Sequence, residues 1–180
     1  FEGEMQPLEV PSGDQTGFKA IGGFTIPAGG TVNVTADFDV RKSVTVTGNV
    51  DKNTNVRYKL RPTIKIIDNI EVGEINGTMT LDLDKNVSSV IVYAYEDGSW
   101  DANESNVTNN FGNAVLSTDA TDGSYTLPWL TVGTYDLVVT SQDVNGTFKD
   151  ILGYINDVFV LTDETTSQDI TDSTLVDTLP

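Results

Sequence analysis

Residues 122–139, which read DGSYTLPWLTVGTYDLVV, decide the fold class of this chain. Gly123 and Gly133 each supply a tight turn, because glycine adopts backbone angles that other residues avoid. After each turn, apolar residues alternate with polar ones, which is the period of a strand with one buried face. This pattern places Tyr125 and Leu127 in the core, and the residues after Gly133 repeat it. The segment therefore predicts two consecutive β-strands.

The same alternation recurs on both sides of this segment, so we expect strands joined by turns along most of the chain. In the first half Val32, Val34, Ala36 and Phe38 share one face of a strand, and no helix is expected there. A polar stretch over residues 96–113 separates two strands of the second half. The expected strands cover residues 23–26, 31–39, 43–47, 56–60, 63–67, 73–83, 89–95, 114–117, 122–127, 130–139, 147–151, 157–161 and 165–175.

Charge divides the chain in two and excludes several classes of partner. Residues 1–72 carry eight basic and nine acidic side chains, whereas residues 73–180 carry two and 18. We therefore expect a boundary near residues 69–73, with domains over 1–72 and 73–175 and a tail over 176–180. The net charge of −17 repels nucleic acids and anionic membranes, and no apolar run is long enough to span a bilayer. Neither a nucleic-acid partner nor direct membrane insertion is expected.

The composition also excludes most catalytic chemistry. The chain has no Cys and no His, so disulfides, Cys/His zinc sites and His-based triads are absent. It contains no P-loop, G-x-G-x-x-G or G-x-S-x-G motif. We predict that the chain is not an enzyme and has no cofactor, calcium excepted. Its start, Phe1-Glu2-Gly3-Glu4, has no signal-peptide pattern, so a processed or truncated product is expected.

The second half, residues 73–175, is similar to the carboxypeptidase-regulatory-like (transthyretin-like, Cna-B-like) β-sandwich. Three segments carry this resemblance: Gly77-Thr78-Met79, Val92-Tyr93-Ala94-Tyr95, and above all the Asp-Gly-x-Tyr-x-Leu and Leu-x-x-Gly-x-Tyr patterns of residues 122–135. In that family the last segment is a strand, a crossing and the next strand. The resemblance implies a sandwich of two antiparallel sheets.

The first half resembles the C-terminal half of a prokaryotic surface-lipoprotein domain of unknown function, of the type with a Thr-Asp-Ala-Pro motif. The resemblance rests on residues 8–19, 24–30, 37–39, 43–44 and 58–64. That domain is often followed by a carboxypeptidase-regulatory-like module, as here. This chain lacks the N-terminal half of that domain. Either the missing strands were removed, which leaves an open edge, or another chain supplies them to a strand-accepting first module. The prediction is an all-β chain of two tandem Ig-like or transthyretin-like antiparallel β-sandwich modules, the first incomplete.

Two acidic loops have the alternating oxygen ligands that calcium prefers. Asp82, Asp84 and Asn86 alternate along one loop, and Asp97 and Asp101 lie in the other. Ordinary turn chemistry is the alternative, and favoured, explanation for the same residues.

Two tryptophans and six sequons are the remaining candidate sites. Trp100, in the polar loop, is the candidate for stacking on a sugar ring, whereas Trp129 is expected to pack in the core or between strands. The number of Asn-x-Ser/Thr sequons is about twice that expected by chance, which indicates an extracellular glycoprotein, with compositional drift as the alternative. The candidate glycosylation sites are Asn33, Asn76, Asn86, Asn103, Asn106 and Asn145.

Together these features predict a non-enzymatic structural or adhesive protein, located extracellularly at a cell surface. In one version the chain is a pilus-like filament subunit assembled by β-strand exchange, with residues 1–10 and 165–180 as donor strands. Its partners are then further copies, or a complementary N-terminal fragment bound at an edge strand, with glycans as further ligands. The alternative is a carbohydrate- or calcium-binding accessory module of a secreted protein.

Overall fold

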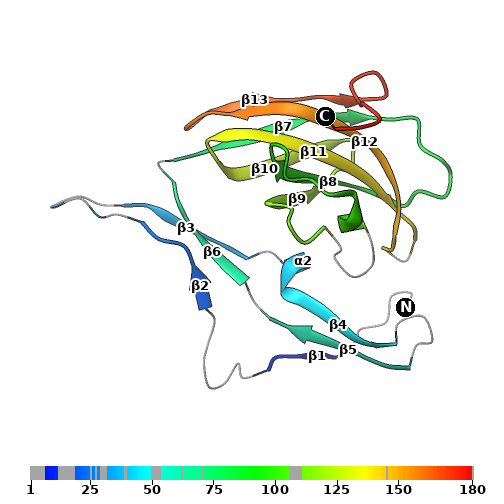
Figure 1. The fold of residues 1–180 in the computed structure, drawn as a ribbon, viewed down its shortest axis with the longest axis horizontal. Coiled ribbons are helices and arrows are strands. Elements are labelled where there is room, and N and C mark those ends of the chain that lie inside the picture. Colours follow the sequence, from blue (N-terminus) through cyan, green and yellow to red (C-terminus); the bar gives the residue numbers. More distant parts are fainter. Residues whose placement is uncertain are drawn as a thin grey trace. The chain divides into compact units, whose positions relative to one another are not determined.

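Strands form in both halves of the chain, as the computed structural model in Figure 1 shows. The structure describes residues 7–11, 19–24, 26, 28, 32–38, 40–49, 54–61, 63–69, 71–105, 111–144 and 146–179. The chain divides into two units, which we call the N-terminal unit, Phe1–Asn69, and the C-terminal unit, Ile70–Pro180. The prediction of an all-β fold is confirmed.

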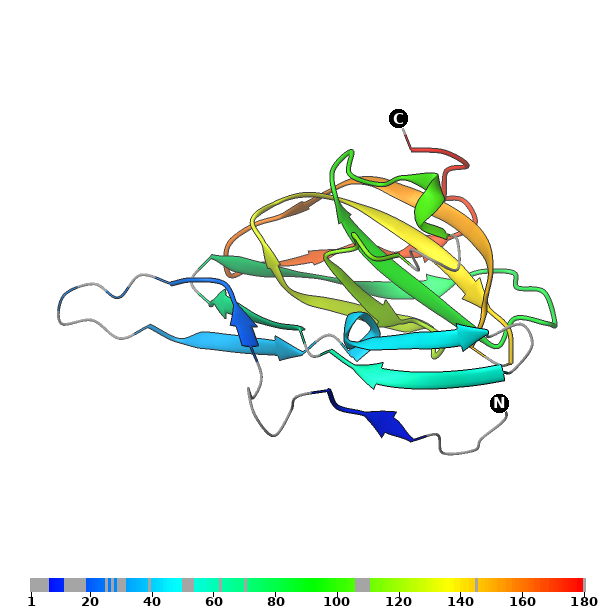
Figure 2. The same ribbon diagram turned by 60° about the horizontal axis from the view of Figure 1, so that its bottom comes forward.

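The N-terminal unit contains two antiparallel strand pairs. Each pair takes one strand from residues 34–49 and the other from residues 54–68. β3 (Val34–Phe38) pairs with β6 (Thr63–Asp68), and β4 (Val44–Asn49) pairs with β5 (Thr54–Leu60). Figure 2 shows β4 and β5 side by side. A single helical turn, α2 (Val40–Ser43), joins β3 to β4.

Two short strands extend these pairs into three-stranded sheets. β1 (Leu8–Glu9) lies parallel to β5, and β2 (Lys19–Ile21) lies parallel to β6. The strand orders are therefore β1-β5-β4 and β2-β6-β3. Short strands added in parallel at a sheet edge lack the tight-turn signature of a hairpin, so the sequence pattern does not reveal them.

The C-terminal unit is a sandwich of two four-stranded sheets. One sheet has the order β12-β11-β8-β9; in the other β7 pairs with β10, β13 and β14. The first sheet contains β8 (Ser89–Glu96), β9 (Leu116–Asp119), β11 (Gly133–Gln142) and β12 (Phe148–Val160). The second contains β7 (Val72–Thr80), β10 (Ser124–Thr131), β13 (Thr165–Ser167) and β14 (Ile170–Thr171).

The core of this unit lies between the two sheets. Tyr125 and Leu127 from β10 pack there with Tyr135 and Leu137 from β11, as the alternation predicts. A second cluster covers the other face of the β8 and β11 strands, where the loop after β8 folds back over the sheet. That loop contains the 3-10 helix η1 (Ala102–Ser105). Both faces of β8 are thus buried, which explains its nearly continuous apolar sequence.

No helix among the described residues is long and apolar enough to cross a membrane.

Candidate functional site

The last strand segment of the chain occupies an edge of the C-terminal unit. We call residues 164–171 the C-terminal strand; it comprises β13 and β14, both parallel to β7. Thr165 aligns with Glu74 and Ser167 with Asn76, and Figure 1 shows β13 running beside β7. Backbone hydrogen bonds fix the register, because the Glu74 N–H donates to the Glu164 carbonyl at 2.9 Å. The Gln168 N–H donates to the Asn76 carbonyl at 2.7 Å.

A carboxylate holds the C-terminal strand at the break between β13 and β14. Asp169 Oδ1 accepts two hydrogen bonds from Thr78, one from its N–H and one from its hydroxyl, each of 2.8 Å. These bonds, the backbone one first, hold the pKa of Asp169 below its ordinary value. The Asp169 side chain therefore provides an acceptor for the Thr78 N–H where the backbone hydrogen bonds to β7 are interrupted between β13 and β14.

Three further contacts fit the strand closely to the sandwich. The hydroxyl of Tyr125 donates to the Gln168 carbonyl at 2.5 Å, and burial, together with the nearby Asp169 charge, raises the pKa of this phenol. Gly77 faces the same carbonyl so closely that a Cβ atom there would collide with it. Ile170 is fully buried in the core between the sheets. The C-terminal strand is thus an integral part of the core rather than an appended tail.

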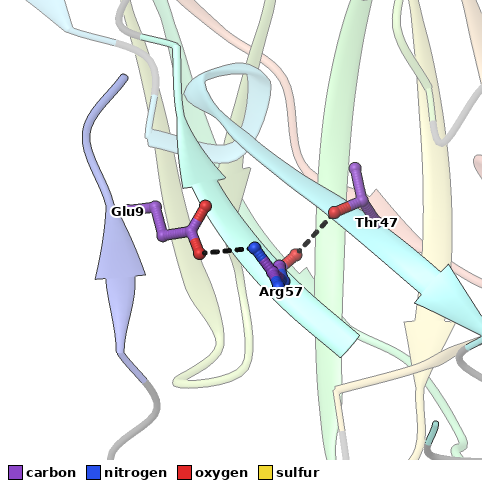
Figure 3. Close-up of polar contacts among 3 residues, drawn as sticks. All are labelled: Glu9, Thr47 and Arg57. Atoms are coloured by element: carbon purple, nitrogen blue, oxygen red, sulfur yellow. Dashed lines mark hydrogen bonds and ion pairs between the residues drawn. The ribbon is translucent and has the colours of Figure 1, made fainter. Parts of the chain in front are cut away.

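The first strand of the N-terminal unit is held more weakly. Leu8 aligns with Tyr58, and an ion pair of 3.4 Å joins Glu9 Oε1 to the Arg57 guanidinium (Figure 3). The Thr47 hydroxyl donates to the Arg57 carbonyl at 3.4 Å on the other side of β5. The two side chains of the ion pair are 64% and 47% exposed, so solvent screens their attraction.

Each sheet of the N-terminal unit has a face with exposed apolar side chains. Leu8, Val46 and Tyr58 align across β1, β4 and β5, which places them on one face. Ile67 is the one large apolar side chain of this unit that is buried among those described. The following side chains are 39–65% exposed: Leu8, Val10, Ile21, Phe24, Ile26, Val34, Phe38, Val40 and Val46. Such a concentration of exposed apolar surface is typical of an interaction surface.

The two predicted donor segments are both paired within the chain, to the extent that they are described. Residues 1–6 and Pro180 lie outside the described residues. Leu8 and Glu9 form β1, and the segment from Thr165 onward forms β13 and β14. Past these strands, Val176 forms an antiparallel bridge with Tyr154 of β12.

Trp100 belongs to an aromatic cluster under the loop that follows β8. Its ring lies edge-on to Tyr95, with centroids 5.0 Å apart, and parallel to Phe111 at 5.9 Å. It is half-buried, and the role of Trp100 in stacking on a sugar stays a prediction. No periodic pattern in the sequence predicts this packing, because the loop contributes isolated aromatic residues.

A buried carboxylate anchors the same loop. Glu104 in η1 accepts a hydrogen bond of 3.1 Å from the Tyr95 hydroxyl and one of 2.9 Å from the Asn113 N–H. The Asn113 side-chain amide also donates to this carboxylate. Burial, followed by the Glu104 charge, raises the pKa of Tyr95. Glu104 thus ties the polar loop to the outer face of β8.

The calcium candidates are not brought together as one acidic cluster. Among the described residues, no group of three or more acidic side chains is placed to hold a metal ion. Asp84 pairs with Lys149 at 3.8 Å, and Asp101 Oδ1 accepts the Asn103 N–H at 2.9 Å within the turn of η1. Asp82, Asn86 and Asp97 are exposed. Turn chemistry accounts for the Asp101 contact, and calcium binding stays a prediction.

The sequons fall in different environments. Asn33, Asn86 and Asn103 are exposed. Asn76 is half-buried in β7, and its amide donates to Glu74 Oε1 at 3.4 Å. Asn106 and Asn145 lie outside the described residues. Use of any of these sites as a glycan acceptor stays a prediction.

Trp129 differs from the expectation that it packs in the core. It is 41% exposed, with a left-handed backbone φ of 59°. Leu127 aligns with Ile75 and Leu130 with Gly73, so one extra residue is inserted between them in β10. This β-bulge turns the Trp129 side chain away from the core. Period-two alternation does not anticipate a bulge, so the sequence pattern does not predict the exposure of Trp129.

Comparison with known proteins gives a family match for the N-terminal unit. Residues 2–62 match the family model described as a domain of unknown function, DUF4382. The match covers less than half of the chain, and it confirms that the first half resembles a domain of unknown function. No curated protein sequence matches the chain.

Two solved structures are similar to parts of this chain. The Bacillus anthracis TIE protein has 12% identity and a TM-score of 0.32, covering 77% of this chain and 24% of that protein. GBS52, the minor pilin of Streptococcus agalactiae, has 14% identity and a TM-score of 0.28, covering 67% of this chain and 53% of that protein. The chain thus spans less than two thirds of either protein, and its function has to be argued from its own strands and side chains.

Proposed function

We propose that this chain is a non-enzymatic structural or adhesive module of a cell surface, which assembles with further copies by exchanging its C-terminal strand. The observation that carries the proposal is that this strand is added in parallel to β7 and anchored by the buried Ile170. An edge occupied by a short segment of the same chain accepts the same segment from a neighbour with identical contacts.

The N-terminal unit supplies the second argument for assembly. Its exposed apolar side chains lose contact with water when a second copy covers them, and burying apolar area drives association. Residues 1–72 are almost neutral, whereas the rest of the chain carries nearly all of the negative charge. Close approach of two copies is therefore least opposed by charge at the N-terminal unit.

The extracellular location is part of the same proposal. It is supported by the six sequons and by the resemblance of the first half to a surface-lipoprotein domain. The absence of Cys and His from the sequence supports a non-enzymatic role, because the commonest nucleophile and general-base pairs require them.

Strand exchange can be tested with introduced cysteines, because the chain has none of its own. Asn76 on β7 and Ser167 on β13 are aligned neighbours, as a disulfide requires. The variants N76C and S167C are mixed, unfolded and refolded together, then oxidised mildly. A covalent heterodimer forms only where the C-terminal strand of one chain lies on β7 of another. We expect its yield to rise with protein concentration.

The matched control replaces S167C with D177C, which carries its cysteine past the C-terminal strand. A mixture of N76C with S167C that gives no more heterodimer than N76C with D177C contradicts strand exchange. The double variant N76C/S167C shows whether the strand forms its pair at all, because at low concentration it should yield a cross-linked monomer.

A further inference from the structure

The outer face of the β10-β7-β13 sheet carries short polar side chains and one exposed tryptophan. Alternation along these strands turns Tyr125, Leu127 and Ile75 inward, where they are buried. The residues between them therefore face outward, and all are exposed or half-buried. On the aligned positions, this outer face consists of Ser124, Thr126, Glu74, Asn76, Thr78, Thr165 and Ser167. Hydroxyl and amide groups predominate on it.

Trp129 stands at one end of this polar face. Because of the bulge, Pro128 and Trp129 together lie opposite Glu74, in the row that continues to Thr165. The next row along the strands contains Thr126, Asn76 and Ser167. Neighbouring strands are about 4.8 Å apart and successive outward rows about 7 Å apart. The exposed ring thus adjoins a row of three hydrogen-bonding side chains within the span of one or two sugar rings.

We propose that this outer face binds a neutral glycan chain, with Trp129 stacking on one sugar ring and the Thr126, Asn76 and Ser167 row bonding the hydroxyls of the next. A sugar ring offers an apolar C–H face and a rim of hydroxyls that both donate and accept hydrogen bonds. Tryptophan fits the first feature, and threonine, serine and asparagine fit the second. Ser167 belongs to the C-terminal strand, and a strand exchanged from a neighbour would place the same side chain beside Asn76. The glycan proposal therefore does not depend on strand exchange.

Charge decides between classes of glycan. Residues 73–180 carry two basic and 18 acidic side chains, so an acidic polysaccharide is repelled from this unit. Glu74, on the central strand β7 opposite Trp129, and Asp169, beside Thr78, provide carboxylate oxygens that accept hydrogen bonds from sugar hydroxyls. A neutral chain satisfies both conditions.

The backbone at Trp129 is consistent with a ring presented for contact. A φ of 59° is rare for a bulky residue, and such a conformation persists where the neighbouring structure enforces it. Here Leu127 and Leu130, on either side, are both fully buried, which fixes the bulge from within. The tryptophan is therefore held away from the core by the packing of its own strand.

The test uses Trp129 as its own reporter. The chain has two tryptophans, so W100F leaves Trp129 as the single one while keeping an aromatic ring next to Tyr95. The full chain is produced unglycosylated, as verified by intact mass, and titrated with neutral hexasaccharides of glucose, mannose, xylose and N-acetylglucosamine. Oligogalacturonate serves as the acidic comparison. We expect a saturable change in Trp129 emission with at least one neutral chain and none with oligogalacturonate.

Affinity is then measured by calorimetry for three further variants. W129A should bind about tenfold more weakly than the unmodified chain, and T126A should also bind more weakly. The matched control is F159A, which removes an exposed aromatic ring from the other sheet and should leave binding unchanged. Absence of saturable binding to every neutral chain at millimolar concentration overturns the proposal. So does equal binding by W129A and F159A.

Discussion

Replacing Ile170 with alanine tests whether the C-terminal strand is part of the core. Ile170 is fully buried between the sheets. Truncating such a side chain removes apolar contacts and leaves a cavity, at a cost of about 2–5 kcal/mol in the free energy of unfolding. With a slope of about 2 kcal/mol per molar urea, the unfolding midpoint should fall by about 1–2.5 M.

Tryptophan fluorescence is the appropriate assay for I170A. Both tryptophans lie in the C-terminal unit, so their emission follows the unfolding of that unit alone. The matched control is L161A, because Leu161 is 52% exposed just past β12 and its truncation should change stability by less than about 0.5 kcal/mol. Equal urea midpoints for I170A and L161A would contradict the prediction, since the strand would then contribute nothing to the core.

Three further predictions concern the contacts that fix the C-terminal strand and the loop after β8. The pKa of Asp169 is lowered in the folded chain, so its contribution to stability is present above its ordinary pKa of 3.8 and lost as the pH falls through the lowered value. D169N should therefore flatten the acid side of the stability profile, measured as urea midpoints from pH 2 to 7 by about one-unit steps. G77A should force the Gln168 carbonyl away from β7 and destabilise the C-terminal unit by about 1–3 kcal/mol, measured by urea unfolding. E104A should cost about 1–3 kcal/mol, because it leaves the buried Tyr95 hydroxyl without its acceptor, whereas E104Q should cost less; a reversed order of these two variants would contradict the anchoring role.

The sequence predicts strands well where one face of the strand is buried and the other is exposed to solvent. The alternation after Gly123 and Gly133 correctly identified Tyr125, Leu127 and Tyr135 as core residues. Such patterns are local, and a strand that obeys them needs no further information to be recognised. The all-β class and the position of the main strands follow from this rule alone.

The pairing of the chain ends could not be predicted in the same way. β13 and β14 are three and two residues long and pair in parallel with β7, far away in the sequence. Segments this short carry almost no periodicity, and parallel pairing leaves no turn between the partners. The contacts that decide their position are specific ones, such as Asp169 with Thr78, which depend on the assembled sandwich.

The two tryptophans show how one inserted residue reverses a prediction about function. Continued alternation from Tyr125 and Leu127 would turn Trp129 inward, and the polar surroundings of Trp100 suggested exposure. Instead the bulge at Pro128 shifts the phase of β10 by one residue, so that Leu130 becomes a core residue and Trp129 faces outward. Trp100 meanwhile packs in the aromatic cluster of the loop that follows β8. The residue most suited to contact a ligand on this unit is thus the one at which strand periodicity fails, which is why the glycan test begins with Trp129.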